Sequence, residues 1–158
     1  MPQRSILKAI LLTVAVAGTL DISDALVFFG FRMHVTPTRL LQNIASHLLG
    51  RSAFGGGNAT VLLGLFLHYF IAACWVTGFV LVAQRLPLLF RQPILCGALY
   101  GLLIYVFMNY VVLPKSRNPS HPTHDPINLA NAILALVLFM GIVVALLNRR
   151  FAPLPPRI

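Results

Sequence analysis

Acidic residues are almost absent from this sequence. Its 158 residues include three aspartates and no glutamate; only 9% of the residues are charged, while 58% are hydrophobic. A soluble domain carries about 25% charged residues. These charges are therefore too few to cover a water-facing surface, and the composition predicts a polytopic membrane protein.

The residue patterns that usually carry catalysis are also missing. The two cysteines, Cys74 and Cys96, stand far apart within apolar segments and form no CxxC motif. The run Gly55-Gly56-Gly57 is not followed by Lys-Ser or Lys-Thr, so it is not a phosphate-binding loop. No nucleophile stands in a pattern with a base. The sequence therefore predicts no enzymatic activity and no cofactor.

Positive charge is abundant by comparison, because 12 lysines and arginines give a formal net charge of +9. These residues stand singly or in pairs at the ends of apolar runs, with no basic stripe and no interleaved aromatic residues. Such placement is typical of side chains that anchor helices at lipid headgroups. We therefore expect the lipid bilayer as a partner and exclude nucleic acid.

Four apolar segments are long enough to cross a hydrocarbon core about 30 Å thick. Pro93 and Pro126 suit the first position of a helix, and Pro87 and Pro114 end the helices before them. We predict one all-α membrane domain over residues 1–158, built as a four-helix bundle. The predicted spans are 9–31, 59–83, 93–113 and 126–147.

The first span has a rival interpretation as a cleavable signal peptide. Arg4 and Lys8 precede an apolar run that ends in Ala15-Val16-Ala17, a pattern typical of such peptides. However, the apolar pattern resumes over residues 25–31, as a spanning helix requires. We therefore favour a span.

The connection between the first two spans is predicted to contain an amphipathic helix over residues 37–50. Thr36-Pro37 is a typical helix start, and Gly50 a typical end. The helix, between spans one and two in the sequence, should lie in the membrane interface or be tucked against the mouth of the bundle. The apolar stripe, which we expect to be buried, is Leu40, Leu41, Ile44, Ala45 and Leu48. The opposite face carries Arg39, Gln42, Asn43, Ser46 and His47.

The distribution of basic residues predicts the orientation. An even number of spans places both termini on one side, and seven basic residues fall on that side against five on the other. The positive-inside rule then favours cytoplasmic N- and C-termini. The seven are Arg4, Lys8, Arg85, Arg91, Arg149, Arg150 and Arg157; the five are Arg32, Arg39, Arg51, Lys115 and Arg117.

Three segments resemble a family of small, functionally uncharacterised four-span proteins of the bacterial inner membrane. They are AGTLDI at 17–22, RLLQNIAS at 39–46 and MNYVVLP at 108–114. The resemblance covers nearly the whole chain. It implies a helical bundle in the bacterial inner (plasma) membrane and implies no reaction.

Two aspartates fall inside the first span, where a charge costs roughly 2.5–3.5 kcal/mol. Asp21 and Asp24 are three positions apart and therefore share a helix face. As a functional site they would form a proton or cation relay, or a counter-charge for a cationic ligand. As a structural feature they would be a protonated pair bonded to neighbouring helices, or a pair reaching the interface.

Other deep polar residues are His68, Asn109, Asn128 and Asn131. Each of these side chains could form a hydrogen bond between helices. Haem ligation by His68 would need a second buried imidazole, which the spans do not offer. We predict a shared polar cluster for a ligand or proton, within a layer roughly 10 Å deep on the outer side of the midplane. Its members are Asp21, Asp24, His68, Asn109 and Asn131.

Two further patterns are open to two interpretations each. His121, His124 and Asp125 could ligate Zn²⁺ or Cu²⁺, with His34 and His47 on the same side, but a polar loop with incidental histidines explains them better. Gly97 and Gly101 form a small-xxx-small motif that suits either a homodimer face or packing inside the bundle; we favour packing.

These features favour a non-enzymatic accessory or scaffold protein, or a lipid- or quinone-associated subunit of a membrane complex. A small proton-coupled carrier that uses the aspartate pair is the alternative. A membrane enzyme acting on lipid is a third possibility, for which no catalytic set is present.

Overall fold

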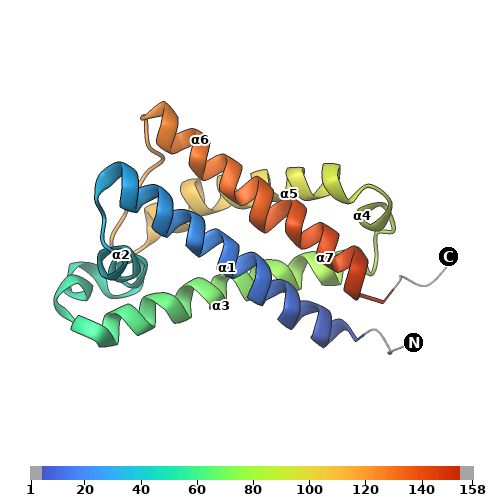
Figure 1. Ribbon diagram of the computed structural model, residues 1–158, viewed down its shortest axis with the longest axis horizontal. Coiled ribbons are helices and arrows are strands. Elements are labelled where there is room, and N and C mark those ends of the chain that lie inside the picture. Colours follow the sequence, from blue (N-terminus) through green and yellow to red (C-terminus); the bar gives the residue numbers. More distant parts are fainter. Residues whose placement is uncertain (1–4, 154–158) are drawn as a thin grey trace.

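The fold is a bundle of long helices capped at one end by a short crossing helix (Figure 1). The structure, a computed structural model, describes residues 5–153, which contain no β-strand. Arg4 and Arg157, which entered the orientation argument, lie outside the described residues. Four helices are long and apolar enough to cross a membrane, as predicted. The first and the last described residues lie at the same end of the bundle, opposite the crossing helix.

The helices α1, α3 and α5 and the pair α6–α7 carry the four spans. Span three continues from α5 through the π-helical segment η2 into the 3₁₀ turn η3, and span four runs from α6 through the π-helical segment η4 into α7. The bounds are α1 (Ile6–Met33), α2 (Pro37–Leu49), η1 (Gly50–Gly55, 3₁₀), α3 (Gly57–Ala83), α4 (Leu88–Arg91), α5 (Pro93–Phe107), η2 (Met108–Val112), η3 (Leu113–Lys115), α6 (Pro126–Ala135), η4 (Leu136–Val143) and α7 (Val144–Phe151).

Local sequence signals explain where α1 ends and where α2 and α6 begin. The α1 helix is continuous over 28 residues, as a span requires, and stops at His34, whose φ of 53° is left-handed. Thr36 caps α2 by accepting a hydrogen bond from the N–H of Arg39. Asp125 caps α6, and a proline occupies the first turn of each of these two helices.

Glycines bring spans three and four into close contact. Gly97 and Gly101 are buried against η4, and an added Cβ on Gly101 would lie 2.5 Å from the carbonyl oxygen of Leu136. Gly141 faces Gly97 in return. The prediction of packing inside the bundle is thus confirmed. The motif is covered by span four of the same chain, so it offers no free face in this structure, and the homodimer stays an untested prediction.

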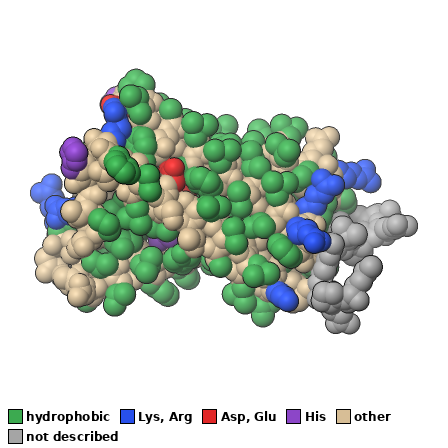
Figure 2. All heavy atoms as spheres, viewed as in Figure 1, with side chains coloured by type: hydrophobic (Ala, Val, Ile, Leu, Met, Phe, Trp, Pro, Cys, Tyr) green, Lys and Arg blue, Asp and Glu red, His purple; other side chains and the backbone are tan. Residues whose placement is uncertain are grey.

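The apolar surface is arranged as membrane immersion requires. Large residues such as Leu62, Phe66 and Leu99 are more than half exposed, whereas Val76, Phe79 and Val144 are fully buried between helices. Figure 2 shows a broad hydrophobic band around the middle, with lysines and arginines gathered toward the two ends. The bilayer would cover that band.

The α2 helix crosses the end of the bundle, but its buried face differs from the predicted one. Gln42 and Ser46, which we placed on the exposed face, are buried, whereas Leu48 is 50% exposed. The reason is the close approach of α2 to Gly64 of α3, where an added Cβ would strike the carbonyl of Leu41. With the two helices this close, Nε2 of Gln42 donates to Oγ1 of Thr60 on α3 at 3.4 Å.

Candidate functional site

A cavity of about 600 Å³ lies between α1, α2, α3 and the parts of spans three and four that are nearer α2. Its walls are mainly apolar. On α3 the wall runs from Leu67 to Trp75, and on span three from Ile104 to Lys115. Its polar members are Asp21, His47, His68, Asn109, Lys115 and Ser116.

Both π-helical segments form part of the cavity wall. Met108, Asn109 and Val112 come from η2, and Leu136 and Met140 from η4. A π-helical turn adds one residue to the helical turn and is frequently found at functional sites. These segments are features of the wall that the hydropathy pattern does not reveal.

Three of the five residues of the predicted cluster meet on this wall: Asp21, His68 and Asn109, which we call the polar triad. His68 donates from Nε2 to the carbonyl oxygen of Gly18 at 2.8 Å, because a carbonyl can only accept. Asn109 donates from Nδ2 to the carbonyl oxygen of Tyr105 at 3.0 Å. Asp21 lies close enough to His68 for their charges to interact.

The other two cluster residues form a separate pair. Asn131 donates from Nδ2 to Oδ2 of Asp24 at 3.0 Å, which joins span four to span one. Neither side chain is on the cavity wall. Asp24 still interacts electrostatically with Asp21, one turn away on α1. The structure therefore divides the predicted cluster into a triad on the cavity and an adjacent bonded pair.

The triad is held in place by the contact between α1 and α3. Beside the His68 bond, the hydroxyl groups of Thr19 and Tyr69 are 2.8 Å apart. Gly18 permits this approach, because an added Cβ would be 3.0 Å from the ring of Tyr69. These neighbouring hydrogen bonds fix the side of α3 that faces the cavity.

At the end of the cavity nearest α2, which we call its outer end, polar contacts join α2 to the segment after span three. Nδ1 of His47 is 2.9 Å from Oγ of Ser116, and Nδ2 of Asn118 donates to Oγ of Ser46 at 2.8 Å. Burial lowers the pKa of His47 from its ordinary value. We call this cluster the outer clasp; its two halves are about 70 residues apart in the sequence, so no local pattern predicts it.

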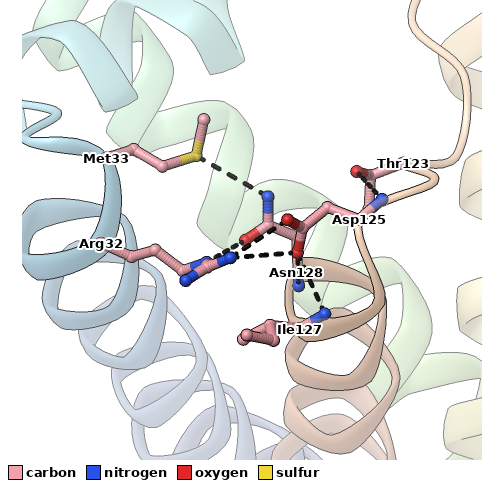
Figure 3. Close-up of polar contacts among 6 residues, drawn as sticks. All are labelled: Arg32, Met33, Thr123, Asp125, Ile127 and Asn128. Atoms are coloured by element: carbon pink, nitrogen blue, oxygen red, sulfur yellow. Dashed lines mark hydrogen bonds and ion pairs between the residues drawn. The ribbon is translucent and has the colours of Figure 1, made fainter.

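Asp125 and Asn128 belong to a second polar cluster at the same end of the bundle (Figure 3). Asp125 accepts hydrogen bonds from the backbone N–H groups of Ile127 and Asn128 and forms an ion pair with Arg32 at 3.0 Å. The N–H of Asn128 and the guanidinium of Arg32 hold the pKa of Asp125 below its usual range. The side chain of Asn128 accepts from Nε of Arg32. The cluster ties the end of span one to the start of span four.

The loop over residues 121–125, which the sequence suggested as a metal site, does not have the arrangement of one. His121 and His124 are exposed, while Asp125 is occupied by the helix cap and by Arg32. Within residues 5–153, no group of three or more histidine, cysteine or acidic side chains is placed to hold a metal ion.

Comparisons with known proteins identify no relative: no protein family, curated protein or solved structure matches the chain. The four-span architecture stands on the structure alone. The resemblance to a bacterial family stays an expectation.

Proposed function

We propose that this chain is a non-enzymatic membrane protein whose cavity binds an amphipathic molecule of the size of a lipid chain or a quinone. Such a protein would serve as an accessory or scaffold subunit of a larger membrane complex. The observation that carries the proposal is the cavity, which reaches from the outer clasp to the polar triad.

The cavity has the properties expected of a small-molecule site. Its volume of about 600 Å³ lies within the range of about 300–1,000 Å³ typical of ligand pockets. Apolar side chains such as Ile71, Ile104 and Met140 form most of the wall, and a few polar groups converge in its middle. Such a wall suits a ligand with an apolar body and one polar group. A purely polar solute would leave the apolar wall without contacts.

We place the protein in the bacterial inner membrane with both termini in the cytoplasm. The resemblance of three segments to an inner-membrane family supports the location. The excess of basic residues at the end that carries the termini supports the orientation. The cavity would then lie in the outer-leaflet half of the membrane, because the outer clasp is at the end of the bundle opposite the start of α1.

Native mass spectrometry of the gently purified chain tests the proposal. The unmodified chain should retain an amphipathic molecule, and Val112→Trp should reduce its occupancy by filling the cavity. Val111→Trp is a matched control, because Val111 and Val112 are both 37% exposed but only Val112 lines the cavity. Equal loss in both variants, or no bound molecule in the unmodified chain, would contradict the proposal.

Proton-coupled transport is a second candidate, and the aspartates of span one are the observation that favours it. Asp24 is bonded to Asn131 of span four, and Asp21 interacts electrostatically with His68 of α3, which is span two. Asp24, Asp21 and His68 thus form a series of neighbouring titratable groups. In proteoliposomes that report internal pH, Asp24→Asn should abolish proton flux. If proton flux through the unmodified chain were no faster than in empty liposomes, proton-coupled transport would be refuted.

A further inference from the structure

The polar atoms of the triad that have no partner among the described residues are all hydrogen-bond acceptors. Nε2 of His68 carries a proton, because it donates to the carbonyl of Gly18. In the neutral imidazole the other ring nitrogen, Nδ1, is then a hydrogen-bond acceptor. No hydrogen bond to Nδ1 is present among the described residues. His68 therefore offers the cavity an acceptor whose orientation is fixed by its bond to α1.

Asn109 presents an acceptor for the same reason. Its Nδ2 donates to the carbonyl of Tyr105, one turn earlier, and this bond fixes which end of the amide is nitrogen. The amide oxygen receives no hydrogen bond from any residue in 5–153. The free atom of Asn109 is thus its oxygen, and oxygen can only accept.

Asp21 adds a carboxyl group without a hydrogen-bonding partner in the described part of the chain. In its ionised form it accepts hydrogen bonds and carries a negative charge, which is costly inside a membrane unless a cation compensates it. His68 does not supply that cation while its Nδ1 is an acceptor, because the imidazole is then neutral, and Arg32 pairs with Asp125. The basic residue on the cavity wall, Lys115, lies at the outer end beside the clasp.

From these three acceptors we infer that the polar group of the bound amphiphile is a hydrogen-bond donor with positive charge, that is, an ammonium group on an apolar body. An ammonium group donates hydrogen bonds to acceptors of this kind, and its charge compensates Asp21. Trp75, on the same wall, adds an aromatic ring beside the apolar body. This inference rests on the proposed function and specifies its ligand class.

A series of three amphiphiles with one chain and different polar groups tests the inference. The probes are 12-bromododecylamine, 12-bromododecanol and 12-bromododecanoate, added to the chain in phosphatidylcholine nanodiscs. Trp75 is the sole tryptophan of the chain and lines the cavity, so bromine quenching of its emission reports occupancy. Binding in the cavity saturates and is reversed by unlabelled dodecylamine, whereas partitioning into the lipid does neither.

We expect the amine to reach half-saturation at about tenfold lower concentration than the alcohol, and the carboxylate to be the weakest of the three. Asp21→Asn should abolish the advantage of the amine over the alcohol. Asp24→Asn is the matched control and should keep it, because Asp24 is bonded to Asn131 and lies off the cavity wall. Alcohol binding should be the same in all three proteins.

The outcomes separate this inference from the proposed function. Saturable quenching by the alcohol or the carboxylate that equals or exceeds quenching by the amine would overturn the ligand class but leave the cavity as a binding site. An equal loss in Asp24→Asn and Asp21→Asn would overturn the assignment to the triad. No saturable quenching by any probe would overturn the proposed function itself. The comparison of the three probes on the unmodified chain stands even if Asp21→Asn does not assemble.

Discussion

Replacement of Gly101 by alanine should destabilise the bundle strongly. The added Cβ would lie 2.5 Å from both the carbonyl oxygen of Leu136 and the Cα of Val137, whereas ordinary contacts are 3.4–4 Å. Spans three and four would have to separate by about 0.9 Å, the difference between 3.4 and 2.5 Å. The opposing atoms belong to the backbone, so no side-chain rotation relieves the clash. Overpacking of this kind costs about 1–3 kcal/mol, and we expect a value near the upper end.

Gly78→Ala is the matched control, because it makes the same chemical change within a span. Its Cβ would meet only the hydroxyl of Tyr100, at an ordinary contact distance of 3.6 Å. Alanine also favours the helix by up to about 1 kcal/mol over glycine. The two variants should therefore differ by about 3 kcal/mol in free energy of unfolding, which is roughly a hundredfold in the equilibrium constant.

Reversible unfolding in mixed micelles, followed by Trp75 emission, measures this difference. The Trp75 ring lies 6.0 Å from that of Tyr100 and 5.5 Å from that of Phe107, so its emission reports the docking of span three on α3. If Gly101→Ala were as stable as Gly78→Ala, the close contact between spans three and four would be refuted.

Three further predictions concern the ends of the bundle. Burial lowers the pKa of His47, so the free energy of unfolding should fall as pH drops below the ordinary value of 6.5; in denaturant titrations at several pH values, His47→Gln should remove that part of the pH dependence. Asp125→Ala should lower the thermal stability more than Asp125→Asn, because asparagine keeps the helix cap and loses only the ion pair with Arg32; equal effects would contradict this role of the cap. Reporter fusions at Gly56 and Ser120 should be located outside the cytoplasm, and a cytoplasmic signal at Gly56 would reverse the orientation.

The spans could be predicted from sequence because membrane insertion depends on local composition. Long apolar runs marked each span to within a few residues, and the helix-starting prolines Pro93 and Pro126 marked the starts of spans three and four. The shared position of Asp21, His68 and Asn109 also followed from helix length and an antiparallel arrangement. These features depend on distance along the chain, which a sequence records directly.

Features that depend on rotation of one helix against another could not be predicted. Apolar periodicity placed Gln42 and Ser46 outside, but Gln42 is bonded to Thr60 of α3, and Ser46 is bonded to Asn118 after span three. Within uniformly apolar spans no pattern marks which face meets a neighbour, so the contact of Gly141 with Gly97 left no signal. The separation of Asp24 from the triad has the same cause.

The central claim is that an amphipathic molecule occupies the cavity between the outer clasp and Trp75. A single-particle map of the chain in lipid nanodiscs, determined after gentle extraction from the native membrane, tests it most directly. The account predicts one elongated density along Ile104 and Met140, with its polar end within hydrogen-bonding distance of Asp21, His68 and Asn109. A cavity filled by the protein's own side chains, or one that holds only separate water molecules at the triad, would contradict it.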